Sequence, residues 1–134
     1  MRSYVPLIAR ALLGLIFVMS GFSKITGFEG TQQYMASQGM PATAFFLVAA
    51  IVVEIFGGLS VILGVWARAG AAALVLFLIP ATLIFHTDFS QQTQMIMFLK
   101  NVSIMGGLLL LIAYGSGPYS IRSMEVDEPD TAYA

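Results

Sequence analysis

A single acidic residue, Glu54, lies in the middle of a long apolar stretch of this chain. The stretch, residues 42–66, has the sequence ATAFFLVAAIVVEIFGGLSVILGVW and exceeds the roughly 20 residues that a helix needs to cross a bilayer. A carboxylate at the centre of such a helix costs about 2.5–3.5 kcal/mol on insertion scales. Two interpretations follow. Either Glu54 is protonated and hydrogen-bonds a neighbouring helix, or it is a paired or proton-exchanging group of a functional site.

The other polar side chains of interest lie at or just inside the ends of apolar stretches: Lys24, His86, Lys100 and Asn101. His86 is either an interfacial residue bonded to a loop or a proton relay or ligand group. Lys100 can extend outward to water or inward toward Glu54. Asn101 is too short to reach water, so it is expected to hydrogen-bond another helix. These residues are the candidates for chemistry in the chain.

The composition defines the class of protein that positions them. Of 134 residues, 58% are hydrophobic and 10% charged, with a mean hydropathy of +0.88. Soluble domains carry about 25% charged residues, so this is an integral membrane protein. The net charge of −1 and the lack of a basic stripe argue against nucleic acid as a partner. The absence of cysteine excludes disulfides, thiolate metal sites and iron–sulfur clusters, and His86 alone completes no haem or zinc site.

Four apolar spans are predicted, at residues 7–22, 42–63, 69–85 and 95–114. The basic head and apolar run at the N-terminus also resemble a signal peptide, although no convincing small-x-small cleavage site follows. Short links force neighbouring spans to run antiparallel. The predicted fold is therefore an all-α membrane protein, an antiparallel four-helix transmembrane bundle. Paired glycines at residues 57–58 and 106–107 predict close approach of the helices.

A polar segment at residues 27–41 separates the first two spans. Thr31 is expected to cap a short helix that Gly39 ends, which makes this a short amphipathic segment. Tyr34 and Met35 are expected to face the membrane from the interface. The segment is interpreted as a covering loop or as a lid over an opening between helices. Residues 1–121 form the predicted domain, and the acidic residues 122–134 are predicted to be a disordered cytoplasmic tail.

The charge distribution predicts the orientation of the bundle. Four spans put both termini on one side, together with Arg2, Arg10, Arg68 and Arg122, and leave Lys24 and Lys100 on the other. The positive-inside rule makes the arginine side cytoplasmic and the segment at residues 27–41 periplasmic. Arg10, one turn inside the first span, has a stem long enough to reach the interface.

The same topology predicts that the polar candidates converge. Lys24, His86, Lys100 and Asn101 enter from the outer face, and Glu54 lies deeper. Facing helices in a bundle lie about 8–10 Å apart, a distance that a lysine stem bridges. Lys100 is the candidate partner of Glu54. A paired Glu54 would be ionised and an unpaired one neutral, and the sequence is compatible with both states.

The chain resembles the DoxX family of small four-helix membrane proteins and is similar to its YphA-like inner-membrane branch. The resemblance covers about residues 7–121. The pieces that carry it are Arg10 with Gly14; Ser20-Gly21-Phe22-Ser23-Lys24 leading to Gly27-Phe28; Thr31 and Tyr34-Met35-Ala36-Ser37 before Gly39-Met40-Pro41; Glu54 with Gly57-Gly58; Gly64 with Arg68; Phe85-His86; and Phe98-Leu99-Lys100-Asn101 with Gly106-Gly107.

This resemblance implies a bacterial inner-membrane protein with a redox association. Some family members resemble quinone-linked subunits, as in thiosulfate:quinone oxidoreductase. A quinone site needs an apolar crevice and a few hydrogen-bond donors. Glu54 and Lys100 are then the candidate catalytic residues, with Glu54 handling a proton. Lys24, His86 and Asn101 are the candidate ligand-binding residues.

No covalently bound cofactor or metal is expected, and the electrons of such a reaction would come from a partner that holds a flavin, metal or reactive sulfur. The expected partners are the lipid bilayer, a redox partner protein and a second copy of the chain.

Three hypotheses for the function remain open. The chain is an oxidoreductase subunit, without its own cofactor, that offers a quinone or small-molecule site. Alternatively, it is a noncatalytic anchor or interaction protein of a complex, and its polar groups hold the helices together. In the third hypothesis it is a proton-coupled carrier of small solutes that uses Glu54, although the sequence shows no inverted repeat. We expect the first.

Overall fold

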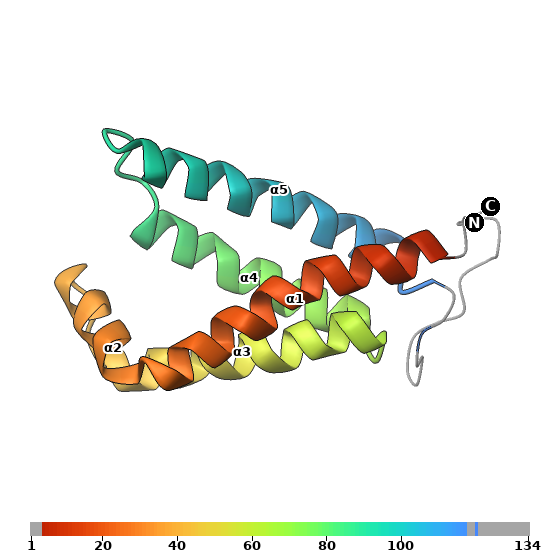
Figure 1. The fold of residues 1–134 in the computed structure, drawn as a ribbon, viewed down its shortest axis with the longest axis horizontal. Helices are drawn as coiled ribbons and strands as arrows, with labels where there is room; N and C mark the ends of the chain where they lie inside the picture. Colours follow the sequence, from red (N-terminus) through yellow and green to blue (C-terminus); the bar gives the residue numbers. More distant parts are fainter. Residues whose placement is uncertain (1–3, 118–119, 121–134) are drawn as a thin grey trace.

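The computed structural model describes residues 4–117 and residue 120. These residues form five α-helices: α1 (Tyr4–Thr26), α2 (Phe28–Ser37), α3 (Thr43–Leu63), α4 (Ala67–Phe85) and α5 (Gln92–Tyr114). No strand occurs in this part of the chain. All but α2 are long and apolar enough to cross a membrane. The predicted all-α four-helix membrane bundle is confirmed, with α2 as the short segment between the first two spans (Figure 1). The predicted tail lies outside the described residues.

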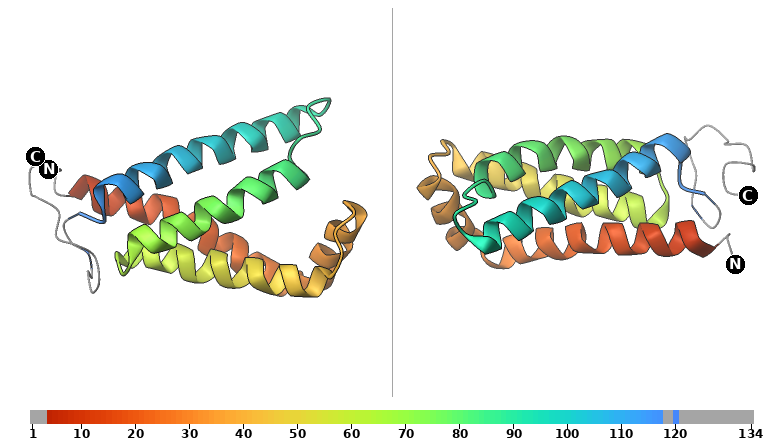
Figure 2. Two further views of the ribbon diagram at one scale, coloured as in Figure 1. Left: turned by 180° about the vertical axis from the view of Figure 1, so that it is seen from behind. Right: turned by 90° about the horizontal axis from the view of Figure 1, so that it is seen from above.

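The four long helices form a wedge rather than a closed bundle. Helix α1 packs along α3, α3 packs on α4, and α4 packs on α5, whereas α1 and α5 scarcely touch. Figures 1 and 2 show the α1/α3 pair and the α4/α5 pair close together at one end and separated at the end that carries α2. The wedge is therefore closed at the end where the chain begins and open at the α2 end.

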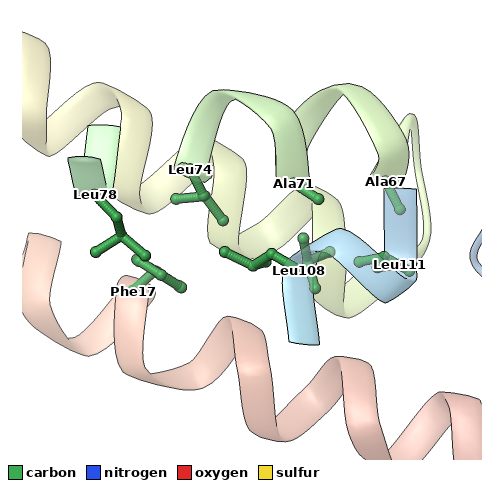
Figure 3. Close-up of a cluster of buried hydrophobic side chains, with 8 residues drawn as sticks. Phe17, Ala67, Ala71, Leu74, Leu78, Leu108 and Leu111 are labelled. Carbon is green, nitrogen blue, oxygen red and sulfur yellow. The ribbon is translucent and has the colours of Figure 1, made fainter. Parts of the chain in front are cut away.

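The hydrophobic core occupies the closed end of the wedge. It is a cluster of side chains from all four long helices: Phe17, Val61, Ala67, Ala71, Leu74, Leu78, Leu108 and Leu111 (Figure 3). The outer faces of the helices keep large apolar side chains exposed, such as Leu12, Phe56 and Leu110. Since hydrocarbon surrounds a transmembrane bundle, exposure of these side chains matches their position.

Glycines allow α1 and α3 to come into backbone contact. A Cβ atom built on Gly14 would lie 2.6 Å from the Gly58 carbonyl oxygen, and one on Gly58 would lie 2.9 Å from the Gly14 oxygen. On the other face of α3, a Cβ on Gly57 would lie 2.9 Å from Leu74 of α4. The predicted close approach is thus confirmed for Gly57 and Gly58, and also for Gly107, whose Cβ would lie 3.1 Å from Leu13 of α1. Gly106 differs, because nothing lies within 4 Å of its Cβ position.

The side chain of Arg10 packs against the end of α3. Its side chain is 1% exposed, and its Nη1 donates a hydrogen bond of 3.0 Å to the carbonyl oxygen of Ile62. This carbonyl belongs to the last turn of α3, where backbone oxygens lack helical partners and the helix dipole favours a positive charge. Arg10 therefore joins the start of α1 to the end of α3.

Helix α2 begins earlier than predicted. It starts at Phe28 with Gly27 as its N-cap, and the Thr31 hydroxyl donates to the Gly27 carbonyl oxygen at 2.9 Å instead of capping the helix. Gly39, with φ of +86°, follows its end as expected, because glycine tolerates this left-handed conformation. Helix α2 then lies across the open end of the wedge (Figure 1).

Candidate functional site

A large crevice occupies the open part of the wedge. Its volume is about 1160 Å³, and side chains of all five helices line it. Phe17 and Leu78 of the hydrophobic core form part of its lining, so the core ends where the crevice begins. The five residues singled out in the sequence also line it: Lys24, Glu54, His86, Lys100 and Asn101. The remaining lining is mostly apolar.

Glu54 forms an ion pair with Lys24 inside this crevice. Lys24 Nζ lies 2.8 Å from Glu54 Oε1 and also donates a hydrogen bond of 2.8 Å to Ser20 Oγ. The side chain of Glu54 is 3% exposed and that of Lys24 is 26% exposed. Because a buried carboxylate is costly without a partner, Lys24 provides the compensation that Glu54 requires.

The direction of helical side chains explains why Lys24, and not Lys100, reaches Glu54. Side chains in an α-helix lean toward its N-terminus. Helix α1 starts at the closed end, so Lys24 leans inward over Ser20, while Glu54 on the antiparallel α3 leans outward to meet it. Helix α5 starts at the open end, so Lys100 leans away from the centre and is exposed. The pairing of Lys100 with Glu54 considered from the sequence is therefore replaced by the Lys24 pair.

Asn101 hydrogen-bonds another helix, as expected. Its Nδ2 donates to Thr82 Oγ1 at 3.0 Å, and both side chains are buried. The bond joins α5 to α4 at the crevice wall. A donor that already has a partner is less available to a ligand, so the structure gives Asn101 a bracing contact within the site.

His86 and Lys100 keep unused polar groups. His86 caps the C-terminal end of α4, and its Nδ1 is buried without a hydrogen-bond partner among the described residues. Lys100 likewise forms no ion pair with that part of the chain. A neutral imidazole nitrogen donates or accepts according to its tautomer, and an ammonium group donates three hydrogen bonds. Among the five residues singled out in the sequence, these two thus keep bonding capacity that is open to a ligand.

Helix α2 contributes to the crevice at its open end. Met35 is buried there and Tyr34 stacks on Phe85 of α4, with ring centroids 5.4 Å apart. The expectation that Met35 faces the membrane is wrong, because Met35 is 6% exposed. Tyr34 stacks on Phe85 but stays 46% exposed. The interpretation of this segment as a cover agrees with its position across the wedge.

The sequence contained a signal for some contacts that were not predicted. Ser20 precedes Lys24 by four residues, which places both on one face of α1. No comparable signal exists for Thr82 with Asn101 or for Tyr34 with Phe85, because these pairs join residues of different helices. Among the described residues, no group of three His, Asp or Glu side chains is placed to hold a metal ion.

The fold and this crevice define the class: an all-α membrane protein with four spans and, between them, a mostly apolar crevice that contains a few polar side chains. Comparison with known proteins identifies the family, because the DoxX family model matches residues 5–87. The chain belongs to the DoxX family.

Two relatives span most of its length. It is 41% identical over 115 residues to the inner membrane protein YqjF of Escherichia coli. The aligned region covers 86% of this chain and 87% of YqjF. It is 38% identical over 125 residues to the inner membrane protein YphA of the same organism, covering 90% and 89% of the two chains.

A third relative shares a shorter region. A Bacillus subtilis protein named "Putative oxidoreductase CatD" is 39% identical over 75 residues, which is 56% of this chain and 54% of CatD. No solved structure matches the chain.

Proposed function

We propose that this DoxX-family protein is an inner-membrane subunit of an oxidoreductase system and that its crevice takes a quinone or a similar small molecule. The observation that carries the proposal is the crevice itself, an apolar space of about 1160 Å³. It holds a buried ion pair and two polar residues that have no partner among the described residues. Ligand sites have this character: mostly apolar walls with a few placed polar groups. The names of the relatives, two of them "Inner membrane protein" and one "Putative oxidoreductase", support it.

The chemistry assigned to the chain is binding and proton transfer. Reduction of a quinone to a quinol takes up two electrons and two protons. Lys100 and His86 would donate hydrogen bonds to the quinone oxygens. The Glu54–Lys24 pair would deliver one proton, and water at the open end of the crevice would supply the other and reprotonate the pair. This chain has no cysteine for thiol redox chemistry, and the electrons would come from a partner protein with a flavin, metal or reactive sulfur. A redox partner and a second copy of the chain are the protein partners of the proposal.

We also propose that both termini lie in the cytoplasm. Arg10 and Arg68 lie at the closed end of the wedge, and Lys24 and Lys100 lie toward the open end. Under the positive-inside rule the arginine-bearing end faces the cytoplasm. The open end and α2 then face the periplasm.

Native mass spectrometry of the protein from gently extracted membranes tests the site. The expected result is a bound mass of quinone size that is lost in Lys100→Met and Glu54→Gln. Glu29→Gln is the matched control, because Glu29 is exposed on α2 and does not line the crevice. Lys100→Met is the more informative variant, since Lys100 makes no ion pair with the described residues.

A noncatalytic anchor is the second candidate, and the contacts between helices favour it. Lys24–Glu54 joins α1 to α3, and Asn101–Thr82 joins α5 to α4, as polar contacts that hold a membrane bundle together do. A chain that carries only lipid or a partner protein, regardless of these substitutions, would support the anchor. Loss of proton-coupled flux in vesicles on Glu54→Gln would instead support a carrier.

A further inference from the structure

We infer that the crevice takes its ligand sideways from the bilayer, and that this ligand has a hydrocarbon tail and an oxygen-bearing head group that Lys100 and His86 hold. The inference rests on the proposed function and narrows the ligand class of the same site. Quinones with a tail and fatty carboxylates share this chemistry. Small water-soluble molecules do not.

The crevice is open on the side between α1 and α5. Helices α1 and α5 scarcely touch, and both contribute to the lining, with Ile16 on α1 and Ile104 on α5. Figures 1 and 2 show the two helix pairs spread apart in this region. Some lining side chains are themselves on the outer surface, including Leu76, which is 70% exposed. In a bilayer such a surface meets acyl chains, so the crevice is continuous with the hydrocarbon.

The crevice is large and mostly apolar, which fits a ligand with a hydrocarbon tail. Sites for drug-sized ligands have volumes of roughly 300–1,000 Å³. The crevice, at about 1160 Å³, lies above that range, and most of its lining is apolar. A compact polar molecule would leave much of this apolar wall uncovered. A hydrocarbon tail covers this apolar lining, while the head group of the same ligand remains near the polar residues.

The contacts within the crevice leave Lys100 and His86 for the head group of a ligand. Lys24 and Glu54 compensate each other, and Asn101 is bonded to Thr82. Within the described part of the chain, Lys100 has no ion-pair partner at the crevice, and His86 Nδ1 has no hydrogen-bond partner. Lys100 lies about 12 Å along α5 from its first residue, since each residue adds about 1.5 Å. This arrangement favours oxygen acceptors, neutral or singly anionic, and disfavours a cationic head group.

Quenching of tryptophan fluorescence by lipids brominated on their acyl chains tests the open side. Trp66 is the single tryptophan, so Trp66→Phe provides a background without signal. Phe77→Trp then reports from the crevice lining, and Phe56→Trp reports from the exposed outer face of α3. We expect Phe77→Trp to be quenched at least half as strongly as Phe56→Trp. Weaker quenching in vesicles would overturn the inference. If Phe77→Trp does not fold, Ile104→Trp, at a half-buried lining position on α5, replaces it under the same criterion.

Binding in lipid nanodiscs tests the ligand class. The probes are 2,3-dimethoxy-5-methyl-1,4-benzoquinone with and without a decyl tail, and dodecanoate. We expect at least one tailed probe to bind at about tenfold lower total concentration than the tailless quinone, since buried methylenes favour the apolar phase. Lys100→Met should remove this binding, and the control Glu29→Gln should keep it.

The outcomes separate this inference from the proposed function. If the two quinones bind equally well, the inference is wrong and the proposed function stands. If dodecanoate alone binds in a manner that depends on Lys100, the inference stands and the quinone function does not. Binding of no probe, or tailed binding that persists in Lys100→Met, overturns the inference.

Discussion

At the scale of single residues, the decisive contact is the ion pair between Glu54 and Lys24. The sequence shows that a carboxyl group in the second span requires a partner, because an uncompensated charge in hydrocarbon is costly. Two lysines on the same side of the membrane were available. The lean of helical side chains toward the N-terminus decides between them, since it directs Lys24 inward and Lys100 outward. Because the Glu54 side chain is only 3% exposed, the ion pair contributes to the stability of the fold as well as to the chemistry of the site.

A double-mutant cycle checks this pairing. Glu54→Gln and Lys24→Met should each lower the free energy of unfolding, because each leaves a buried or half-buried charge without its partner. Combined, they should cost less than the sum by about 1–3 kcal/mol, the range for residues in contact. The measurement is reversible unfolding in mixed micelles. Glu54→Gln combined with Lys100→Met is the matched control and should be additive. If the Glu54→Gln and Lys24→Met effects add up, the ion pair does not contribute to stability and the prediction is wrong.

The bond from Asn101 to Thr82 gives a second prediction. Thr82→Val keeps the shape of the side chain and removes the acceptor, so the buried Asn101 amide loses its partner. We expect a loss of about 0.6–2 kcal/mol in the same unfolding measurement, the range for hydrogen bonds between transmembrane helices. Ser103→Ala serves as control, because the exposed Ser103 hydroxyl bonds only the carbonyl of Leu99 in its own helix. An equal effect of both substitutions would contradict the assignment.

At the scale of elements, the contact between α1 and α3 is the most extensive one between helices in the described part of the chain. Gly14 and Gly58 face each other, and backbone oxygens occupy the places where Cβ atoms would lie. This contact fixes the height of Lys24 relative to Glu54. Arg10 fixes the other end of the same helix pair through the last turn of α3. The α1/α3 pair is therefore expected to behave as one rigid unit, and the α4/α5 pair completes the crevice.

Substitution of glycine by alanine tests this contact. Gly58→Ala gains up to about 1 kcal/mol of helix propensity. Against this, its Cβ would lie 2.9 Å from the Gly14 oxygen, and overpacking costs about 1–3 kcal/mol. The net expectation is a lower thermal midpoint of unfolding. Gly106→Ala is the matched control on α5, where nothing lies within 4 Å and the midpoint should stay or rise. A higher midpoint for Gly58→Ala would contradict the close approach.

At the scale of the whole molecule, the wedge determines what the protein can bind. Three of the four possible helix contacts around the bundle are well packed, and the fourth, between α1 and α5, is nearly absent. The core fills the closed end, and α2 lies across the open end (Figures 1 and 3). A crevice with this position is accessible from the bilayer and is shielded from one aqueous side by the core.

The orientation of the molecule is checked by cysteine labelling, which the cysteine-free chain makes simple. Ser37→Cys, at the end of α2, should react with an impermeant maleimide in intact cells, because the open end is expected to face outward. Ser123→Cys should react only after the membrane is broken. Labelling of Ser123→Cys alone in intact cells would invert the orientation.

The sequence by itself determined the membrane class, the four spans and the identity of the polar residues. Composition and the length of apolar runs are local properties, and hydrocarbon admits few alternatives to a helix. The spans at residues 42–63 and 69–85 agree with α3 and α4 to within two residues. The convergence of Lys24, Glu54, His86, Lys100 and Asn101 on one crevice also followed from topology, since antiparallel spans bring their ends together.

Only the tertiary structure decided how these residues divide their roles. Pairing of Lys24 with Glu54, and of Asn101 with Thr82, depends on the relative height and rotation of different helices, which side-chain packing sets. The same holds for the inward position of Arg10 and the stacking of Tyr34 on Phe85. The opening between α1 and α5 arises because α1 packs along α3 and α5 packs along α4, while α1 and α5 meet only near the core at the closed end. This balance of packing energies is not encoded in any local pattern of the chain.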